Sequence, residues 1–274
     1  MTAQTSTFQR AGHALAGTAW TGATTPTSAE AGPLPQIVFP PDTRRRVTDT
    51  TTYPWSTFGQ LIMDFPNGGR YTGTATLIDR HHLLTAAHNV FGNDIGGWAR
   101  NIWFARSRDG DTLPGGFVPA TRAFITEDYF TKSPPNPNES GGNVGDVTLY
   151  TYDYAVVRLR DALPNPIMGM YAAGDIELPD LARITGYPGD KRPADTMWTD
   201  MGPIRPEDLE HFLFYRINTF RGESGAAIVA DLELPIGKTI VGVHVAGDPE
   251  LETNFGVRLS EEVLENVRTW MNTA

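Results

Sequence analysis

The sequence predicts an all-β fold, built as a pair of β-barrels and closed by one helix at the C-terminus. From residue 37 onward, short β-branched and aromatic runs alternate with clusters of turn residues, which is typical of strands and tight connections. The 28 Gly and 21 Pro supply many turns and favour β-meanders over helical bundles. A chain of 274 residues suits one compact unit with an appended tail, or two small barrels that share one cleft.

The expected strands are short and are separated by turn signals. Gly59–Phe65 and Arg70–Ile78 flank Pro66-Asn67-Gly68-Gly69, a pattern that predicts a β-hairpin. Further strands are expected at Ile102–Arg106, Tyr154–Leu159, Ala182–Tyr187, Phe212–Asn218, Ala226–Ala230 and Thr239–Ala246. Residues 131–146, rich in Pro, Asn, Ser and Gly, predict a long surface loop.

The last fifteen residues carry the one clear helical pattern. Ser260 is a good N-cap, and Glu261 and Glu262 suit the first turn of a helix. One apolar face follows at helical spacing, made of Val263, Leu264, Val267, Trp270 and Met271. Many strands followed by one terminal helix favour an all-β barrel pair that the helix closes.

Composition excludes several classes of function. The formal net charge is −10, and it argues against a nucleic-acid partner or an anionic membrane surface. The run Arg44-Arg45-Arg46 is only three residues long and is interpreted as a solvated surface patch. The chain has no Cys, which excludes a cysteine nucleophile, disulfides and thiolate metal sites. We expect no cofactor and no metal, because no cluster of His and Asp supports a metal site.

Three local patterns carry residues suited to catalysis. Leu83-Leu84-Thr85-Ala86-Ala87-His88 is an apolar strand that ends in small residues and an imidazole. Tyr152-Asp153-Tyr154, before an apolar strand, places a carboxylate where it is largely buried and needs a partner such as an imidazole N–H. Gly222-Glu223-Ser224-Gly225 puts glycine on both sides of a serine, which frees the backbone to point two N–H groups at one spot.

Each pattern alone is more often a turn, a cap or a structural histidine, but together they are specific. Their order is His, Asp, Ser, with 65 residues from His88 to Asp153 and 71 from Asp153 to Ser224. This spacing lets one barrel supply His and Asp and the next supply Ser. The expected organisation is a flexible tail or pro-segment over 1–36, a first barrel over 37–165, and a second barrel with the C-terminal helix over 166–274.

These patterns resemble the chymotrypsin-like serine peptidases, and more narrowly the glutamyl endopeptidases typified by staphylococcal V8 protease. The run that begins Ile37-Val38-Phe39-Pro40 is similar to the mature N-terminus of that group. The block Gly186-Tyr187-Pro188-Gly189-Asp190-Lys191, the most specific part, is similar to its second-barrel signature. Gly242-Val243-His244 is similar to the segment that carries its pocket histidine. The resemblance runs from Ile37 to the last helix.

The resemblance implies two six-stranded antiparallel barrels and serine endopeptidase activity. His88, Asp153 and Ser224 are then the catalytic triad, and the N–H groups of Gly222 and Ser224 form the oxyanion hole. Thr219 and His244 match pocket residues that bind a substrate carboxylate, so the implied specificity is for Glu, with Asp weaker.

Four further expectations concern the pocket and the chain start. Asn218 stands six residues before Ser224 and offers no counter-charge to Lys or Arg substrates. Arg221 either reaches over the pocket rim or points to solvent. Cleavage between Gln36 and Ile37 is expected to free an Ile37 amine that helps hold the substrate carboxylate. His244 has the alternative of being a strand histidine packed in the barrel.

Three functions therefore compete. The first is an active peptidase that prefers acidic residues, the second has the same chemistry with another specificity, and the third is a catalytically silent binding protein on the same fold. The partner expected is a peptide or protein substrate, without nucleic acid or membrane, and we expect a monomer. The resemblance implies a secreted protein, although no signal peptide is visible at the start of the sequence.

Overall fold

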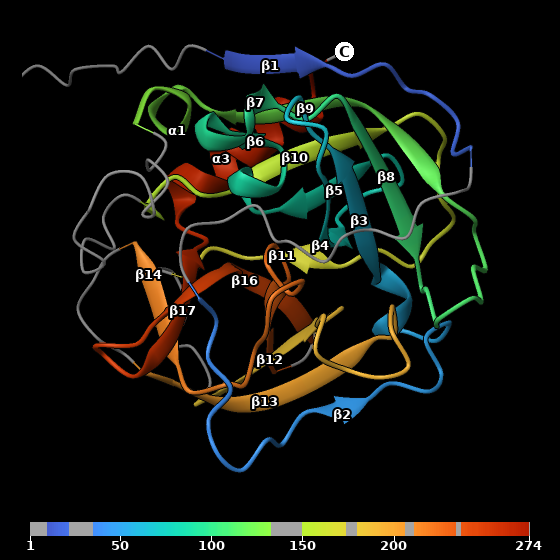
Figure 1. The fold of residues 1–274 in the computed structure, drawn as a ribbon. Coiled ribbons are helices and arrows are strands. Elements are labelled where there is room, and N and C mark those ends of the chain that lie inside the picture. Colours follow the sequence, from blue (N-terminus) through green and yellow to red (C-terminus); the bar gives the residue numbers. More distant parts are fainter. Residues whose placement is uncertain are drawn as a thin grey trace, which may run out of the picture.

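The computed structural model describes residues 10–21, 35–132, 150–173, 180–205, 211–233 and 237–273. Its strands form two closed antiparallel barrels, one above the other in the view of Figure 1. No helix among these residues is long and apolar enough to cross a membrane.

Six strands close the first barrel, as expected. In spatial order they are β9 (Val118–Thr126), β10 (Ala155–Leu159), β5 (His82–Thr85), β4 (Arg70–Leu77), β3 (Phe58–Asp64) and β8 (Asn101–Arg106), and β8 pairs again with β9. The predicted hairpin is confirmed as β3 and β4, whose turn is closed by the Phe65 N–H donating to the Gly69 carbonyl at 3.0 Å. Gly68 has φ +83°, a conformation that glycine adopts without strain.

The second barrel also closes with six strands. In spatial order they are β16 (Lys238–Asp248), β15 (Ala227–Asp231), β12 (Leu181–Gly186), β13 (Trp198–Arg205), β14 (Phe212–Tyr215) and β17 (Thr253–Arg258), and β16 pairs again with β17. The short strand β11 (Gly169–Met170) lies parallel to β16. Another short strand, β2 (Arg45–Arg46), comes from before the first barrel and pairs with β13 of the second.

Short helices and one small hairpin complete the described elements. They are η1 (Trp55–Thr57), η2 (Ala87–Asn89), η3 (Asn93–Ile95), α1 (Glu127–Lys132), α3 (Glu261–Met271), and the pair β6 (Phe91–Gly92) and β7 (Gly97–Trp98). The predicted surface loop over 131–146 begins at the end of α1 and lies outside the described residues from 133 onward.

The segment expected to be a tail differs in part from that expectation. Strand β1 (Arg10–Ala14) pairs with β9, and the Trp103 indole N–H donates to the Thr18 carbonyl at 2.8 Å. Residues 10–18 are therefore an edge of the first sheet rather than a free tail, because a strand at a sheet edge offers unpaired backbone groups to any segment that can reach it. Removal of this segment stays a prediction.

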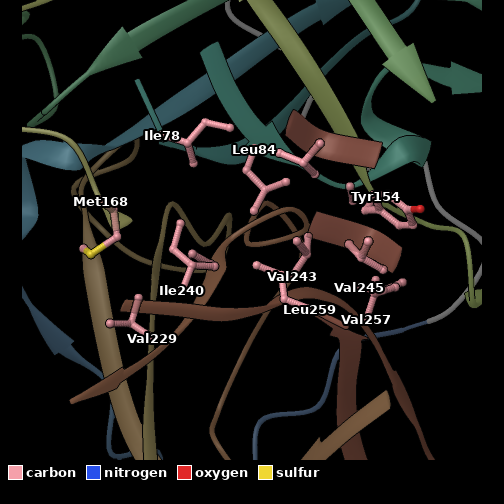
Figure 2. Packing of buried hydrophobic residues seen from close by; sticks show 14 of the residues in the cluster. Ile78, Leu84, Tyr154, Met168, Val229, Ile240, Val243, Val245, Val257 and Leu259 are labelled. Atoms are coloured by element: carbon pink, nitrogen blue, oxygen red, sulfur yellow. The ribbon is translucent and has the colours of Figure 1, made fainter. Parts of the chain in front are cut away.

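One hydrophobic cluster joins the two barrels and the C-terminal helix. Figure 2 shows Ile78 and Leu84 of the first barrel facing Ile240 and Val243 of the second. The predicted helix is confirmed as α3: the Ser260 hydroxyl accepts from the Val263 N–H at 3.3 Å. Its Trp270 ring packs against the ring of Tyr154, which directly follows Asp153. Burial of these apolar side chains holds the barrels in fixed relation at the site between them.

Candidate active site

Strand pairing in the first barrel brings His88 and Asp153 together. Strand β5 pairs with β10 so that Thr85 lies opposite Ala155; His88 follows β5, and Asp153 precedes β10. The Asp153 carboxylate contacts the imidazole Nδ1 at 2.7 Å and accepts the His88 backbone N–H at 2.9 Å. Asp153 is fully buried, and a buried carboxylate is stable only with such partners. The two bonds fix both the orientation and the tautomer of the ring.

Ser224 belongs to the second barrel, but its backbone is hydrogen-bonded to the first barrel. The Thr74 N–H of β4 and the Asn89 side chain of η2 each donate to the Ser224 carbonyl at 2.9 Å. The Thr74 hydroxyl also donates to the Gly222 carbonyl at 2.8 Å. The loop that carries Ser224 is thus held against the barrel that carries His88 and Asp153.

Two glycines allow this close approach. Gly222 has φ +101°, and a Cβ added there would lie 2.4 Å from the Tyr187 carbonyl oxygen. Gly225 has φ +84°, and a Cβ there would lie 2.1 Å from the Thr85 hydroxyl oxygen. Any side chain at either position would force the loop away from its neighbours.

The residues before Ile37 reach the serine. The Gln36 side-chain amide donates to Ser224 Oγ at 2.8 Å, and Ser224 Oγ donates to the Val245 carbonyl at 3.2 Å. The Gly247 N–H donates to the Pro35 carbonyl at 2.7 Å. Nothing in the sequence alone pointed to Gln36 as a partner of the serine. Pro35 and Gln36 therefore lie directly against Ser224 and against strand β16 of the second barrel.

The two expected carboxylate-binding side chains lie deep beside residues 220–226, the loop that carries Ser224 (the serine loop). His244 and Thr219 are both fully buried, and the His244 carbonyl accepts the Gly225 N–H at 2.9 Å. His244 Nδ1 lies 2.6 Å from the buried Tyr215 hydroxyl, a partner that the sequence did not reveal. The side-chain atoms Nε2 of His244 and Oγ1 of Thr219 are buried without a hydrogen-bond partner among the described residues.

Burial also sets the charge of His244. Desolvation, and next the nearby charge of His88, lower the pKa of His244 to about 3, although the Phe255 carbonyl acts in the opposite direction. The imidazole is therefore neutral at ordinary pH and carries one N–H. His244 therefore gives the pocket no positive charge, but its neutral imidazole still offers one N–H donor to a ligand.

The remaining expected pocket residues have different surroundings. The Asn218 side chain accepts from the Phe39 N–H and donates to Thr43 and Asp200, so it supports the segment after Ile37 rather than offering a free group to a substrate. Arg221 is exposed. The Ile37 N–H donates to the Asn254 side chain at 2.9 Å, and the Ile37 carbonyl accepts the Thr219 N–H at 3.2 Å, which places Ile37 next to the pocket.

The interpretation of Arg44 as part of a solvated patch is wrong. Its side chain is 1% exposed and lies among Asp42, Asp190 and Glu223, whereas Arg45 and Arg46 are exposed. Two of its acidic partners, Asp190 and Glu223, are distant in the chain, so the run of arginines alone gives no sign of these ion pairs. Asp190 lies in the signature block of the resembled group, but the sequence alone gives it no partner.

Solved structures with the same architecture were found for most of the chain. A Glu endopeptidase in complex with MPD superposes with a TM-score of 0.69 at 23% identity, over 86% of this chain and all of that one. The protease Anisep from Arthrobacter nicotinovorans gives 0.61 at 15% identity, over 83% and 98% of the two chains. The thermostable serine protease AL20 gives 0.60 at 16%, over 80% and 98%. The fold is that of the chymotrypsin-like serine peptidases.

Curated relatives narrow the resemblance. A glutamyl endopeptidase of Bacillus licheniformis is 28% identical over 239 residues, 85% of this chain and 68% of the relative. A protein of Bacillus subtilis named extracellular metalloprotease is 27% identical over 245 residues, 87% and 71% of the two. No family model matches the sequence. The chain is a serine endopeptidase that resembles the glutamyl endopeptidases.

The name of the Bacillus subtilis relative implies a metal in that protein. In the part of the chain that the structure describes, no three His, Cys, Asp or Glu side chains gather closely enough to hold an ion. The peptidase relatives act on peptide or protein substrates, and the same class of substrate applies here.

Proposed function

We propose that this protein hydrolyses peptide bonds after Glu, and more weakly after Asp, through an acyl-enzyme on Ser224. The observation that supports the specificity is a pair of polar atoms, Thr219 Oγ1 and His244 Nε2, that are buried without a hydrogen-bond partner among the residues that the structure describes. Buried polar atoms without partners are rare and costly in folded proteins, and two beside a nucleophile suit a ligand that pairs with both.

In this proposal the triad works through defined proton transfers. Ser224 Oγ attacks the scissile carbonyl while His88 Nε2 takes the hydroxyl proton, and Asp153 stabilises the imidazolium that forms. The Gly222 and Ser224 N–H groups stabilise the oxyanion, and His88 returns the proton to the leaving amine. Water, activated by His88, then releases the acyl group from Ser224 and completes the cycle.

The pocket assignment follows from the donors present. In this assignment the Tyr215 hydroxyl, 2.6 Å from His244 Nδ1, is the donor of that pair, so the imidazole proton is on Nε2, where it is available to the substrate carboxylate. Thr219 Oγ1 supplies the second donor. A Lys, Arg or Phe side chain would leave both atoms unpaired, at a cost of about 1–3 kcal/mol each. The Asp carboxylate is one methylene shorter and falls short of both donors.

Cleavage between Gln36 and Ile37 is part of the proposal. Gln36 Nε2 bonded to Ser224 Oγ supports a latent uncleaved chain, and Ile37 next to Thr219 supports a freed amine that reaches the substrate carboxylate. N-terminal sequencing of active enzyme should read Ile-Val-Phe-Pro. Full activity of a chain that still begins at Met1 would contradict this part alone.

We place the protein outside the cell as a monomer, which the name of the extracellular Bacillus subtilis relative supports for the location.

The decisive experiment is mapping of cleavage sites on a mixed peptide library, with Ser224→Ala as the inactive control. We expect cuts after Glu, fewer after Asp and hardly any after Lys, Arg or Phe. Best cleavage after Lys or Arg would reject the acidic pocket while leaving the triad untouched. Hydrolysis by Ser224→Ala at the wild-type rate would reject the nucleophile.

A further inference from the structure

Glu223, between the two residues of the proposed oxyanion hole, has a buried side chain that turns back under its own loop. Its carboxylate accepts the Phe220 N–H at 2.8 Å, and its backbone N–H donates to the Phe220 carbonyl at 3.0 Å. The peptide between Glu223 and Ser224 carries the Ser224 N–H. The direction of that N–H therefore depends on how the Glu223 side chain is held.

The Arg44 guanidinium faces this carboxylate. Its Nη1 lies 3.6 Å from Glu223 Oε2, and the two side chains are 1% and 2% exposed. A buried carboxylate keeps its charge only beside such a partner. The fixed positive charge of Arg44 thus compensates the negative charge of Glu223 in the serine loop.

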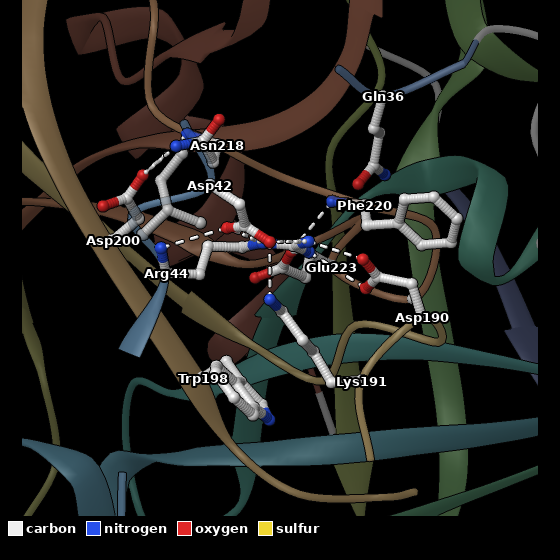
Figure 3. Close-up of polar contacts among 12 residues, drawn as sticks. Gln36, Asp42, Arg44, Asp190, Lys191, Trp198, Asp200, Asn218, Phe220 and Glu223 are labelled. Atoms are coloured by element: carbon white, nitrogen blue, oxygen red, sulfur yellow. Dashed lines mark hydrogen bonds and ion pairs between the residues drawn. The ribbon is translucent and has the colours of Figure 1, made fainter. Parts of the chain in front are cut away.

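Arg44 itself is clamped from two sides. Its guanidinium bonds bidentately to Asp42, at 3.0 and 2.9 Å, and to Asp190, at 3.0 and 2.5 Å. Lys191 Nζ lies 2.5 Å from Asp42, and Figure 3 shows these groups converging from the N-terminal segment, the 186–191 block and the serine loop. The planar fork of Arg suits this geometry, which a Lys would not reproduce.

The charge of Arg44 is permanent. Burial opposes it, but the hydrogen bonds with Asp42 and Asp190, together with the charge of Glu223, raise the pKa of the guanidinium above its ordinary value. The residue also follows Ile37 in the chain, so it remains with the enzyme after cleavage between Gln36 and Ile37. Its interaction with Glu223 requires no new N-terminus.

We propose that Arg44 is a positioning residue. It holds the serine loop through Glu223, so that the N–H groups of the oxyanion hole are organised both before and after cleavage of the chain. The inference rests on the proposed function of Ser224 and Gly222. It assigns the Ile37 amine no part in shaping the loop, since the Ile37 nitrogen bonds to Asn254 instead. The 186–191 block then contributes indirectly to the position of the serine loop, because its Asp190 holds Arg44.

The test compares Arg44→Met with Arg44→Lys and Glu223→Gln in the enzyme that begins at Ile37. A misplaced oxyanion donor acts in the transition state, so Arg44→Met should lower kcat about 100-fold, with KM within about threefold. The affinity for a peptidyl boronic acid, whose tetrahedral adduct occupies the hole, should fall by a similar factor. Substrate binding to the same variant carrying Ser224→Ala should not change. Arg44→Lys should recover part of the loss.

Arg46→Met is the matched control, because it removes an exposed ion pair with Asp109 from the same segment and should leave kcat unchanged. Wild-type kcat in folded Arg44→Met would overturn the inference, as would a loss confined to KM. If Arg44→Met does not fold, Glu223→Gln decides, since Gln still accepts the Phe220 N–H but carries no charge. Wild-type kcat there would also overturn it.

The outcome is separable from that of the proposed specificity. Cleavage-site mapping of Arg44→Met should show the same preferred residue as the wild type, at a lower rate. Loss of kcat in an enzyme that turns out to prefer another side chain would keep this inference and reject the glutamyl pocket.

Discussion

His244 combines complete burial with one committed ring nitrogen, and this explains how a neutral side chain could recognise an anion. Nδ1 is taken by Tyr215, so the ring cannot rotate freely, and Nε2 makes no hydrogen bond of good geometry in the described part of the chain, although the Phe255 carbonyl acts on the ring. A histidine packed merely to fill the barrel would be expected to have both nitrogens satisfied or solvated. The geometry thus favours the pocket role over the packing alternative, which the following experiment distinguishes.

His244→Ala should reduce kcat/KM for Glu substrates far more than for other residues. Loss of one donor to a carboxylate corresponds to about 1–3 kcal/mol, or about 5- to 150-fold. The measurement is kcat/KM on matched peptides with Glu, Gln or Phe before the scissile bond. The exposed His211→Ala serves as control and should change none of them. Equal losses on all three peptides would mark His244 as structural.

His244 should also make folding sensitive to acid. Its pKa is about 3 in the folded chain against an ordinary 6.5, so between these values the unfolded chain binds a proton that the folded chain does not. The free energy of unfolding should therefore fall as the pH drops from 6.5 towards 3, by up to about 1.4 kcal/mol per pH unit. Urea unfolding of wild type and His244→Gln at pH 7.0, 5.5 and 4.5 should show a shallower slope for the variant. Parallel slopes would argue against a neutral buried imidazole.

The strands were predicted well from the sequence wherever apolar runs alternate with turn residues. The β3–β4 hairpin, β10, β15, β16 and α3 all lie within a few residues of their expected positions. Strands β9, β13 and β17 were missed, and each has a reason: Pro119 stands near the start of β9, Gly202-Pro203 interrupts β13, and Gly256 weakens the β17 pattern. Their strand form comes from pairing with neighbours, which no local pattern contains.

The residues of the candidate site were likewise predictable only where a local sequence pattern marks them. His88, Asp153 and Ser224 stood out because each lies in a distinctive local pattern, and the structure brings the first two into contact. Gln36, Tyr215 and Arg44 had no such pattern. Their roles arise from contacts between segments far apart in the chain, such as the 188 residues between Gln36 and Ser224.

The Pro35–Ile37 segment should slow the access of reagents to Ser224. Gln36→Ala in the uncleaved chain removes the donor to Ser224 Oγ and should speed labelling by a serine-reactive organophosphonate by about 2- to 10-fold, the worth of one hydrogen bond. Rates are read by mass spectrometry of intact protein. Chains that begin at Ile37 lack residue 36 and give the rate of an unobstructed serine. An uncleaved wild type that labels as fast as those chains would show that Gln36 does not obstruct Ser224.

The two barrels pack closely against each other at the serine loop. Thr74 and Asn89 reach across from the first barrel to the Ser224 carbonyl, and the shared hydrophobic cluster fixes the barrels behind this contact. The geometry of the proposed triad depends on the interface between the barrels, because His88 and Ser224 belong to different barrels. A change that separates the barrels locally should therefore cost activity and stability together.

Gly225→Ala tests this dependence directly. The added methyl would lie 2.1 Å from the Thr85 hydroxyl oxygen and 2.5 Å from the Thr74 carbonyl oxygen, and φ +84° is strained for alanine. Backbone strain and overpacking each cost about 1–3 kcal/mol, so we expect a loss of about 2–6 kcal/mol in the free energy of unfolding. Because the loop must move off Thr74 and Asn89, kcat should fall at least about 100-fold.

Gly115→Ala is the matched control, because a Cβ there has no neighbour within 4 Å, and it should change stability by less than about 0.5 kcal/mol. Denaturant unfolding and kcat on one Glu peptide measure both quantities. A Gly225→Ala enzyme with lowered stability and wild-type kcat would show that the loop can leave the first barrel without disturbing the serine. The contacts from Thr74 and Asn89 would then stabilise the fold without aligning Ser224, and alignment would have to come from the second barrel alone.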